Sequence, residues 1–282
     1  MRKHEKIMEY VFLGVACVSI LAVALICIYL FGNGIPAIAK IGFKEFVFGK
    51  IWKPSSEIYG IFSMIVGSLY VTAGAIIVGV PIGIFMAVFM ARYCPKGLYR
   101  FLKPAVDLLA SIPSVIYGFF GMAVIVPFVR DYIGGTGYSV LTASVLLGLM
   151  ILPTIIGVSE SSLRAVPENY YEGALALGAT PERSIFRVVL PAAKSGVFAA
   201  VVLGVGRAIG ETMAVVMIAG NQPIVPDSLL SGVRTMTTNI VMEMGYAAGL
   251  HSEALIATGV VLFVFILIIN ICFNILKGKK VQ

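Results

Sequence analysis

The chain has 282 residues, of which 59% are hydrophobic and only 12% are charged. Soluble domains carry about 25% charged residues, so this composition excludes an ordinary water-soluble protein and indicates a lipid bilayer as the main solvent. The net charge of +7 does not indicate nucleic-acid binding, because the basic residues are distributed among the loops between apolar segments.

Six segments with no more than two charged residues are each longer than the ~20 residues that cross a ~30 Å hydrocarbon core. They are residues 10–39, 58–91, 104–129, 132–159, 195–226 and 254–276. Their hydrophobicity is continuous rather than alternating, which excludes the strands of a closed β-barrel. We therefore predict an all-α polytopic membrane protein with six transmembrane helices.

The positive residues predict the orientation of these helices. If successive loops are assigned to alternate sides, fourteen Lys and Arg residues lie on the side that holds both termini, and six lie on the other side. The positive-inside rule makes the side with fourteen cytoplasmic. Both termini, a basic tail at 277–282 and the polar segment 159–194 are then expected in the cytoplasm.

The N-terminal region, residues 1–58, is predicted to contain a transmembrane helix and an extracytoplasmic segment. The apolar stretch 11–31 is longer than the core of a cleaved signal peptide, so we interpret it as a retained helix. Residues 32–58 mix aromatic side chains with lysines, a composition typical of a segment at headgroup depth. The aromatic residues are Phe43, Phe46, Phe48 and Trp52.

The core transmembrane domain is predicted to span residues 59–276. In its second span, Gly79 and Gly83 are expected to let another helix approach closely. Pro81 lies between them and is a candidate for a kink used in gating. A short basic turn is expected at 92–103.

The third span carries a carboxyl group near its cytoplasmic end. Asp107 is followed by Ser111 and Ser114. An ionisable residue inside a span is a candidate for a functional site, and a structural hydrogen-bonding role is the alternative. These residues are candidates for gating or for support of a solute pathway. The fourth span is apolar apart from Pro153.

The polar segment 159–194 predicts two short helices that meet at a sharp corner. Residues 168–177 are expected to form the first helix, ended by Gly178 in a left-handed conformation. Thr180 is expected to cap the second helix, which begins with proline and an acidic residue. One face of this segment could fit a groove of a partner, and a loop folded back on its own helices is the alternative.

The spacing of residues in this polar segment resembles the EAA loop of ATP-binding-cassette importer permeases. In that family the pattern is Glu-Ala-Ala, three residues, Gly, nine residues and Ile-x-Leu-Pro, and here Gly173 replaces an alanine and Val188 the isoleucine. The resemblance implies the type I importer permease fold and a loop that docks into a cleft on a cytoplasmic ATPase subunit. The matching residues are Glu172, Gly173, Ala174, Gly178, Leu190 and Pro191.

Two charged residues lie inside the fifth span, which is expected at about 196–219. Arg207 is eleven residues from the start of this span, or about 17 Å, too deep to reach the interface easily. Glu211 is one turn further and is expected on the same helix face. A self-neutralising pair is one interpretation; the other, which we favour, is that both side chains line a hydrated path.

The residues around this pair resemble the phosphate branch of these permeases, in its PstC-type membrane subunit. The similarity is carried by the run 204–221, which includes Arg207, Glu211 and Thr212, and by Trp52-x-Pro54 before Tyr59. It covers about residues 34–277. It implies four kinds of partner: a second, PstA-like permease subunit, a dimer of ATP-binding subunits, an extracytoplasmic phosphate-binding protein and inorganic phosphate. It also implies a prokaryotic cytoplasmic membrane.

A physical hypothesis for phosphate selectivity follows. The planar guanidinium of Arg207 suits a tetrahedral oxyanion. Phosphate near neutral pH still carries acidic protons and donates to a carboxylate such as Glu211, whereas sulfate does not. Permeases for molybdate, sulfate or phosphonate are the alternative within transport.

The sequence argues against an enzyme. It contains no Gly-x-x-x-x-Gly-Lys-[Ser/Thr] motif and no nucleophile, base or metal constellation. We expect no cofactor on this chain, with ATP and magnesium bound by the partner ATPase. An ion-driven secondary transporter is a different class of alternative; it predicts inverted halves with broken helices, which we do not find in the sequence.

Overall fold

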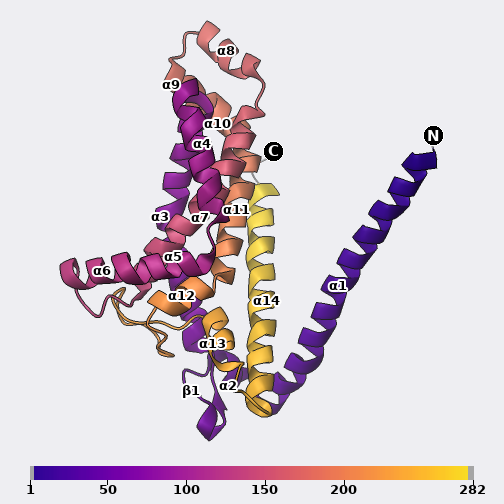
Figure 1. Cartoon of the computed structure of the whole chain (residues 1–282), viewed down its shortest axis with the longest axis vertical. Coiled ribbons are helices and arrows are strands. Elements are labelled where there is room, and N and C mark those ends of the chain that lie inside the picture. Colours follow the sequence, from indigo (N-terminus) through magenta and orange to yellow (C-terminus); the bar gives the residue numbers. More distant parts are fainter. Residues whose placement is uncertain (1–2, 279–282) are drawn as a thin grey trace.

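In the computed structural model, which describes residues 3–278, long helices run side by side from one end of the molecule to the other (Figure 1). Among the described residues, five helical segments are long and apolar enough to cross a membrane, and a pair bent by 70° makes a sixth if it counts as one span. This confirms the predicted all-α membrane fold. Four of the five segments are formed mainly by α1 (Lys3–Ile41), α3 (Phe62–Val88), α7 (Val140–Arg164) and α14 (Leu250–Gly278), and the fifth, Ser114–Tyr132, is made of shorter helices. The bent pair includes α11 (Lys194–Gly210).

Shorter elements lie at the two ends of the bundle and between its helices. At the end of the bundle where α1 meets α14 are α2 (Phe43–Phe48), the antiparallel strands β1 (Trp52–Lys53) and β2 (Ile58–Tyr59) and, between them, the 3-10 turn η1 (Pro54–Ser56) (Figure 1). The middle of the chain forms η2 (Phe89–Tyr93), α4 (Lys96–Ser111), α5 (Ser114–Phe120), η3 (Gly121–Ile125) and α6 (Val126–Tyr132). The rest are α8 (Glu168–Ala176), α9 (Pro181–Ser184), η4 (Ile185–Val189), α10 (Leu190–Ala192), α12 (Met213–Ile218) and α13 (Met236–Glu243).

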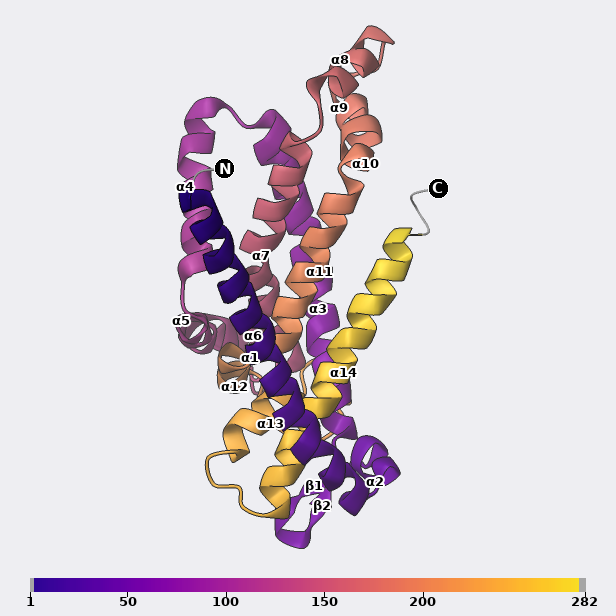
Figure 2. The same cartoon turned by 90° about the vertical axis from the view of Figure 1, so that its right-hand side faces the viewer.

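Helix α1 diverges from the bundle and contacts it only near the start of α14 (Figures 1 and 2). The most apolar stretch of α1 is wholly exposed in the single chain, so lipid or another subunit must cover it. The beginning of α1, the end of α14 and α8 lie at the same end of the molecule (Figure 2). The last four residues of the expected basic tail lie outside the described residues.

The centre of the bundle is a close contact between α3 and α7. A Cβ atom at Gly79 would lie 2.7 Å from the carbonyl oxygen of Gly148, and one at Gly83 would lie 2.7 Å from Cγ2 of Ile155. These glycines therefore provide notches into which the facing helix fits, as predicted. Pro81 is exposed, and α3 continues through it without interruption.

The variant Gly79→Ala is expected to destabilise the chain by about 1–3 kcal/mol, the usual cost of an extra methyl in a filled core. The added carbon would also lie 2.8 Å from Cδ1 of Ile151, so α3 and α7 would have to separate. Thermal denaturation in detergent measures this loss. Gly157→Ala on α7, where nothing lies within 4 Å, is the matched control. Equal melting temperatures for the two variants would contradict the notch.

Two sequence predictions about the elements are wrong. The expected turn at 92–103 is the π-helical turn η2 followed by the first half of α4. The third span is divided at Ile112, and the fifth span is divided at Glu211. Within the N-terminal region, Phe46 and Trp52 are buried against β2 and α14, whereas Phe43 and Phe48 are exposed, and the headgroup depth of this segment stays a prediction.

Candidate translocation site and coupling surface

The two interrupted spans have a local chemical cause. Ile112 precedes a proline, which disfavours helical backbone at that residue, and its ψ is 126°. Glu211 also leaves the helix, with ψ at 132°, and its side chain caps the next helix instead. Each interruption frees backbone groups at membrane depth, an arrangement found where the backbone is buried in protein or lines a hydrated cavity.

The short helices that follow the interruptions, α5 and α12, pack on one another. A Cβ atom at Gly118 would lie 3.2 Å from Cα of Ala214, and one at Gly121 would lie 3.1 Å from Cγ2 of Ile218. Gly118 faces Ala214, and the later Gly121 faces the later Ile218, so the two helices run parallel. Their N-terminal ends therefore lie together. The two interruptions are thus neighbours in space.

Arg207 lies beside these interruptions, in the last turn of α11. Its half-buried side chain donates from Nη1 to Oγ1 of Thr154 at 3.3 Å. Thr154 is ten residues from the end of α7 at Arg164, or about 15 Å, which places the guanidinium well inside the membrane. An arginine at mid-depth costs about 2.5–3.5 kcal/mol to insert, a cost typical of residues with a functional role.

Glu211 does not share a helix face with Arg207, so that part of the sequence interpretation is wrong. The helix ends at Gly210, and Oε1 of Glu211 accepts a hydrogen bond from the backbone N–H of Ala214 at 3.1 Å. Thr237 of α13 donates its hydroxyl to the Glu211 carbonyl at 3.1 Å. The carboxylate thus caps α12, whose positive end favours an acidic group.

The remaining predicted pathway residues occupy different positions. Ser114 is the first residue of α5, and Thr212 lies in the second interruption, donating to the carbonyl of Gly210 at 3.1 Å. Ser111 ends α4 and donates to a carbonyl within that helix. Asp107 is exposed and pairs with Lys103 at 3.3 Å. Ser114 and Thr212 therefore lie at the interruptions with Arg207 and Glu211, whereas Asp107 and Pro81 face outward.

The polar segment 168–191, called the coupling segment from here on, projects from the end of the bundle that also holds the beginning of α1 and the end of α14 (Figure 2). None of the residues of α8, which include Glu172, Gly173 and Ala174, is buried. Leu177, immediately after α8, is 91% exposed. Leu190 and Pro191 form the last short helix before the 70° bend into α11. The exposed segment is thus joined directly to the helix that carries Arg207.

The corner of this coupling segment has the predicted geometry. Gly178 has φ at +84°, the left-handed conformation that favours glycine. The hydroxyl of Thr180 accepts from the N–H of Arg183 at 3.3 Å and caps the following helix.

One carboxylate, which the sequence did not reveal, joins β1, the loop at Arg234, α13 and α14. Glu243 is 6% exposed and accepts from Arg234 Nη1 at 2.7 Å and from Trp52 Nε1 at 2.9 Å. Nε2 of His251 lies 2.8 Å from Oε2 of Glu243, the same oxygen that accepts from Trp52. No pattern in the sequence brings these groups together, because they lie in four segments that meet only in the folded chain.

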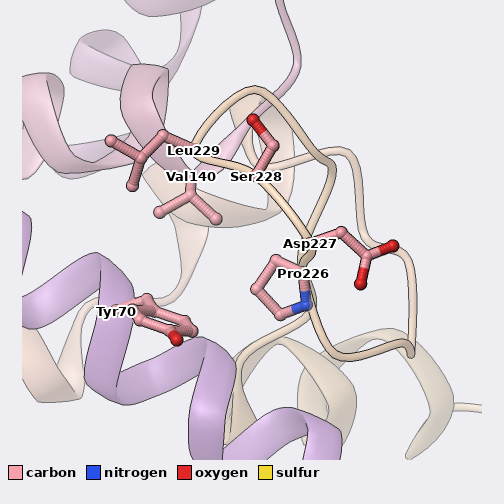
Figure 3. A pocket seen from close by; sticks show the side chains of 6 residues that line it. All are labelled: Tyr70, Val140, Pro226, Asp227, Ser228 and Leu229. Atoms are coloured by element: carbon pink, nitrogen blue, oxygen red, sulfur yellow. The ribbon is translucent and has the colours of Figure 1, made fainter.

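The cavity shown in Figure 3 lies far from Arg207. It has a volume of about 300 Å³ and lies between α3, the start of α7 and the loop 226–229. Its lining residue Val140 is fourteen residues along α7 from Thr154, or about 21 Å from the arginine's partner. A second cavity, of about 390 Å³, adjoins the far end of α12 at Gly220 and Asn221.

The arrangement defines a class of protein. A bundle of membrane length that holds an arginine at mid-depth, beside interrupted backbone, has the features of a solute conduit. Its exposed coupling segment continues into the same helix as that arginine. The chain is thus built as a membrane permease.

Comparisons with known proteins specify the family. Residues 79–280 match the model for "Binding-protein-dependent transport system inner membrane component", and the chain belongs to this family. It is 38% identical to the probable ABC transporter permease protein YqgH of Bacillus subtilis, over 90% of this chain and 86% of that protein. It is 34% identical to the phosphate transport system permease protein PstC of Mesorhizobium japonicum, over 86% of this chain and 81% of that protein.

Solved structures confirm the fold. A bacterial ABC transporter involved in the import of alginate matches with a TM-score of 0.68 over the whole of both chains, at 16% identity. The MetNI methionine ABC transporter matches with a TM-score of 0.62, over 82% of this chain and all of that one, at 21% identity. The fold is that of type I ABC importer permeases. The expectation of unbroken helices was therefore wrong, because the spans are broken at Ile112 and Glu211. The alternative of an ion-driven secondary transporter is still excluded, because the chain belongs to the importer family.

Proposed function

We propose that this chain is a membrane subunit of an ATP-driven phosphate importer. It forms half of the translocation pathway, with a second, PstA-like permease subunit forming the other half. The observation that carries the proposal is Arg207, which lies at mid-depth beside the two interruptions. Supporting it are several relatives named as phosphate transport system permeases, at 31–34% identity.

The energy for transport would come from partners. The coupling segment at 168–191 docks on a cytoplasmic dimer of ATP-binding subunits, which hold ATP and magnesium, while this chain binds no cofactor. The docking residues are Glu172, Gly173, Ala174, Gly178, Leu190 and Pro191. An extracytoplasmic phosphate-binding protein delivers the solute to the opposite end. Both termini are cytoplasmic, in a prokaryotic inner membrane, which agrees with the common location of the two helix ends and α8 (Figure 2).

The residues at the interruptions would select the anion. Arg207 attracts it through planar, charged donors, and Thr212 offers a hydroxyl next to it. Glu211 accepts from the acidic protons that phosphate retains. In the present structure this carboxylate caps α12 through Oε1, so a solute would engage its other oxygen.

Uptake by cells that express the complete complex tests this function. We expect labelled phosphate uptake to be inhibited by unlabelled phosphate and not by equal sulfate, molybdate or phosphonate. Glu211→Gln keeps the oxygen that caps α12 but loses the charge, so the advantage of phosphate over sulfate should fall by about 1–3 kcal/mol, or roughly 5- to 150-fold.

Two results would argue against parts of this proposal. Inhibition of wild-type uptake by molybdate or sulfate, and not by phosphate, would favour the alternative permease for that oxyanion. Unchanged discrimination by Glu211→Gln would restrict that carboxylate to its capping role. The parent complex with an empty vector in place of this chain provides the background.

A further inference from the structure

A buried carboxylate outside the proposed route lies near the cytoplasmic end of α7. Glu160 is 2% exposed, and its Oε1 accepts from the hydroxyl of Tyr99 at 2.7 Å and from Nε of Arg164 at 2.8 Å. Nζ of Lys103 lies 3.5 Å from the other oxygen, Oε2. Tyr99 and Lys103 both belong to α4, so this one side chain attaches α4 to α7.

Helix α4 has little other support in the bundle. Val106 is its one buried side chain, and it packs in a small cluster with Met90 and Ile156. Leu102 is half-buried against the same cluster. The remaining faces of α4 are mainly exposed, so the polar contacts of Glu160 supply much of what holds this helix in place.

The same region holds the base of the coupling segment. Arg92 of η2 donates from Nη1 to Glu168, the first residue of α8, at 2.7 Å, and from Nη2 to the carbonyl of Leu163 at 3.1 Å. Arg164 donates to the carbonyl of Met90 at 2.8 Å. The start of α8, the end of α3 and the end of α7 are therefore linked by hydrogen bonds, and Arg164 extends this set to Glu160.

The opposite end of α4 leads to the solute site. From Lys103 to the last residue, Ser111, is about 12 Å of continuous helix. Beyond the first interruption, the hydroxyl of Tyr117 on α5 donates back to the carbonyl of Leu109 at 2.9 Å. A displacement of α4 at Lys103 would thus reach the interruption beside the arginine.

The contact between Glu160 and Lys103 is incompletely formed. Oε2 is buried and accepts no hydrogen bond from any described residue, although the ammonium is within ion-pair distance. Lys103 also lies 3.3 Å from Asp107 on its own helix. Burial alone would lower the pKa of Lys103, yet the hydrogen bond to Asp107 and the charges of Glu160 and Asp107 raise it, so the lysine stays charged. A small shift of α4 would move this charge between the two carboxylates.

We propose that Glu160 is a positioning residue that transmits movement of the coupling segment to the interruption between α4 and α5. It acts through Tyr99 and Lys103 and contacts no solute. The inference rests on the proposed function, since it needs an ATPase that moves the coupling segment. It adds a second mechanical connection, through α4, to the direct one through α11.

The test uses Glu160→Gln in the complete complex, reconstituted in liposomes. Glutamine keeps the size of the side chain and an oxygen for Tyr99, but it loses the charge that faces Lys103. We expect phosphate uptake to fall by about tenfold, a typical coupling effect, while ATP hydrolysis in the same vesicles stays within about twofold of wild type. Glu160→Asp, which restores the charge, should recover part of the uptake.

Arg100→Gln is the matched control, because it removes a charge from the exposed face of the same helix. It should leave the ratio of phosphate transported to ATP hydrolysed unchanged. Equal loss of uptake and hydrolysis by Glu160→Gln would assign the residue to fold stability and overturn the proposal. A wild-type ratio of phosphate transported to ATP hydrolysed in Glu160→Gln, with neither activity reduced, would also overturn it.

A measurement without solute separates this inference from the proposed function. Spin labels at Leu108 on α4 and Val241 on α13, both exposed, report their separation in a complex in which the four cysteines of this chain are replaced by serine and the other subunits carry no reactive cysteine. ATP should change this distance in the wild-type background and not with Glu160→Gln. If phosphate is not transported, the labels still test the connection; an equal change in both backgrounds would refute it.

Discussion

Replacing Arg207 with alanine is expected to abolish most phosphate uptake while the complex continues to hydrolyse ATP. The guanidinium is half-buried at mid-depth, and Thr154 is the side-chain partner it contacts. Truncating a buried, hydrogen-bonded charge that meets its ligand typically costs 2–5 kcal/mol, or about 30-fold or more in uptake at low phosphate. Arg207→Lys keeps the charge but loses the planar fork, so it should transport at an intermediate rate.

The control for this experiment is Arg130→Gln, which removes the same charge from an exposed ion pair with Asp131 on α6. Its uptake should match wild type, because exposed pairs contribute little. Wild-type uptake by Arg207→Ala would remove the central observation behind the proposed route. Loss of ATP hydrolysis together with uptake would show that the residue supports assembly instead.

Placing valine at position 178 is the second change expected to have a large effect. Gly178 has φ at +84°, which a β-branched residue adopts only with strain, and its N–H bonds to the carbonyl of Leu175 at 2.9 Å. The corner between α8 and α9 would have to open, and the exposed face of the coupling segment would no longer match the cleft proposed for it on the ATP-binding subunit. We expect the ATPase subunits to dissociate on purification and uptake to fall to background.

The chain itself should still insert and fold, because nothing in the structure lies within 4 Å of a Cβ at Gly178. Gly97→Val is the matched control: it lies at the same end of the molecule, has open space around it and has no positive φ. Co-purification of the ATPase measures both variants. Full recovery of ATPase with Gly178→Val would mean that this corner does not set the docking geometry.

Local signals in the sequence predicted the coupling segment well. The left-handed Gly178 and the Thr180 cap depend on adjacent residues only, and the structure confirms both. The notch at Gly79 was also predicted, because small residues at helical spacing allow close packing.

The interruptions of the spans were not predicted because hydropathy does not register them. The residues on both sides of Ile112 are apolar enough to continue a span, and the proline that follows was the one local signal. Glu211 was interpreted as a membrane charge, whereas its capping bond to Ala214 depends on the helix ending first. The contacts of Glu160 and Glu243 join distant segments, so no sequence period reveals them.

The carboxylate of Glu243 has a mechanical consequence for the whole subunit. It fastens the β-hairpin, the loop at Arg234, α13 and α14 at a single point, and removing one member of such a buried set typically costs 3–5 kcal/mol. These four elements should therefore move together as one rigid unit. Movement imposed on the coupling segment would then be accommodated at mid-depth, where the helices are already interrupted at Ile112 and Glu211.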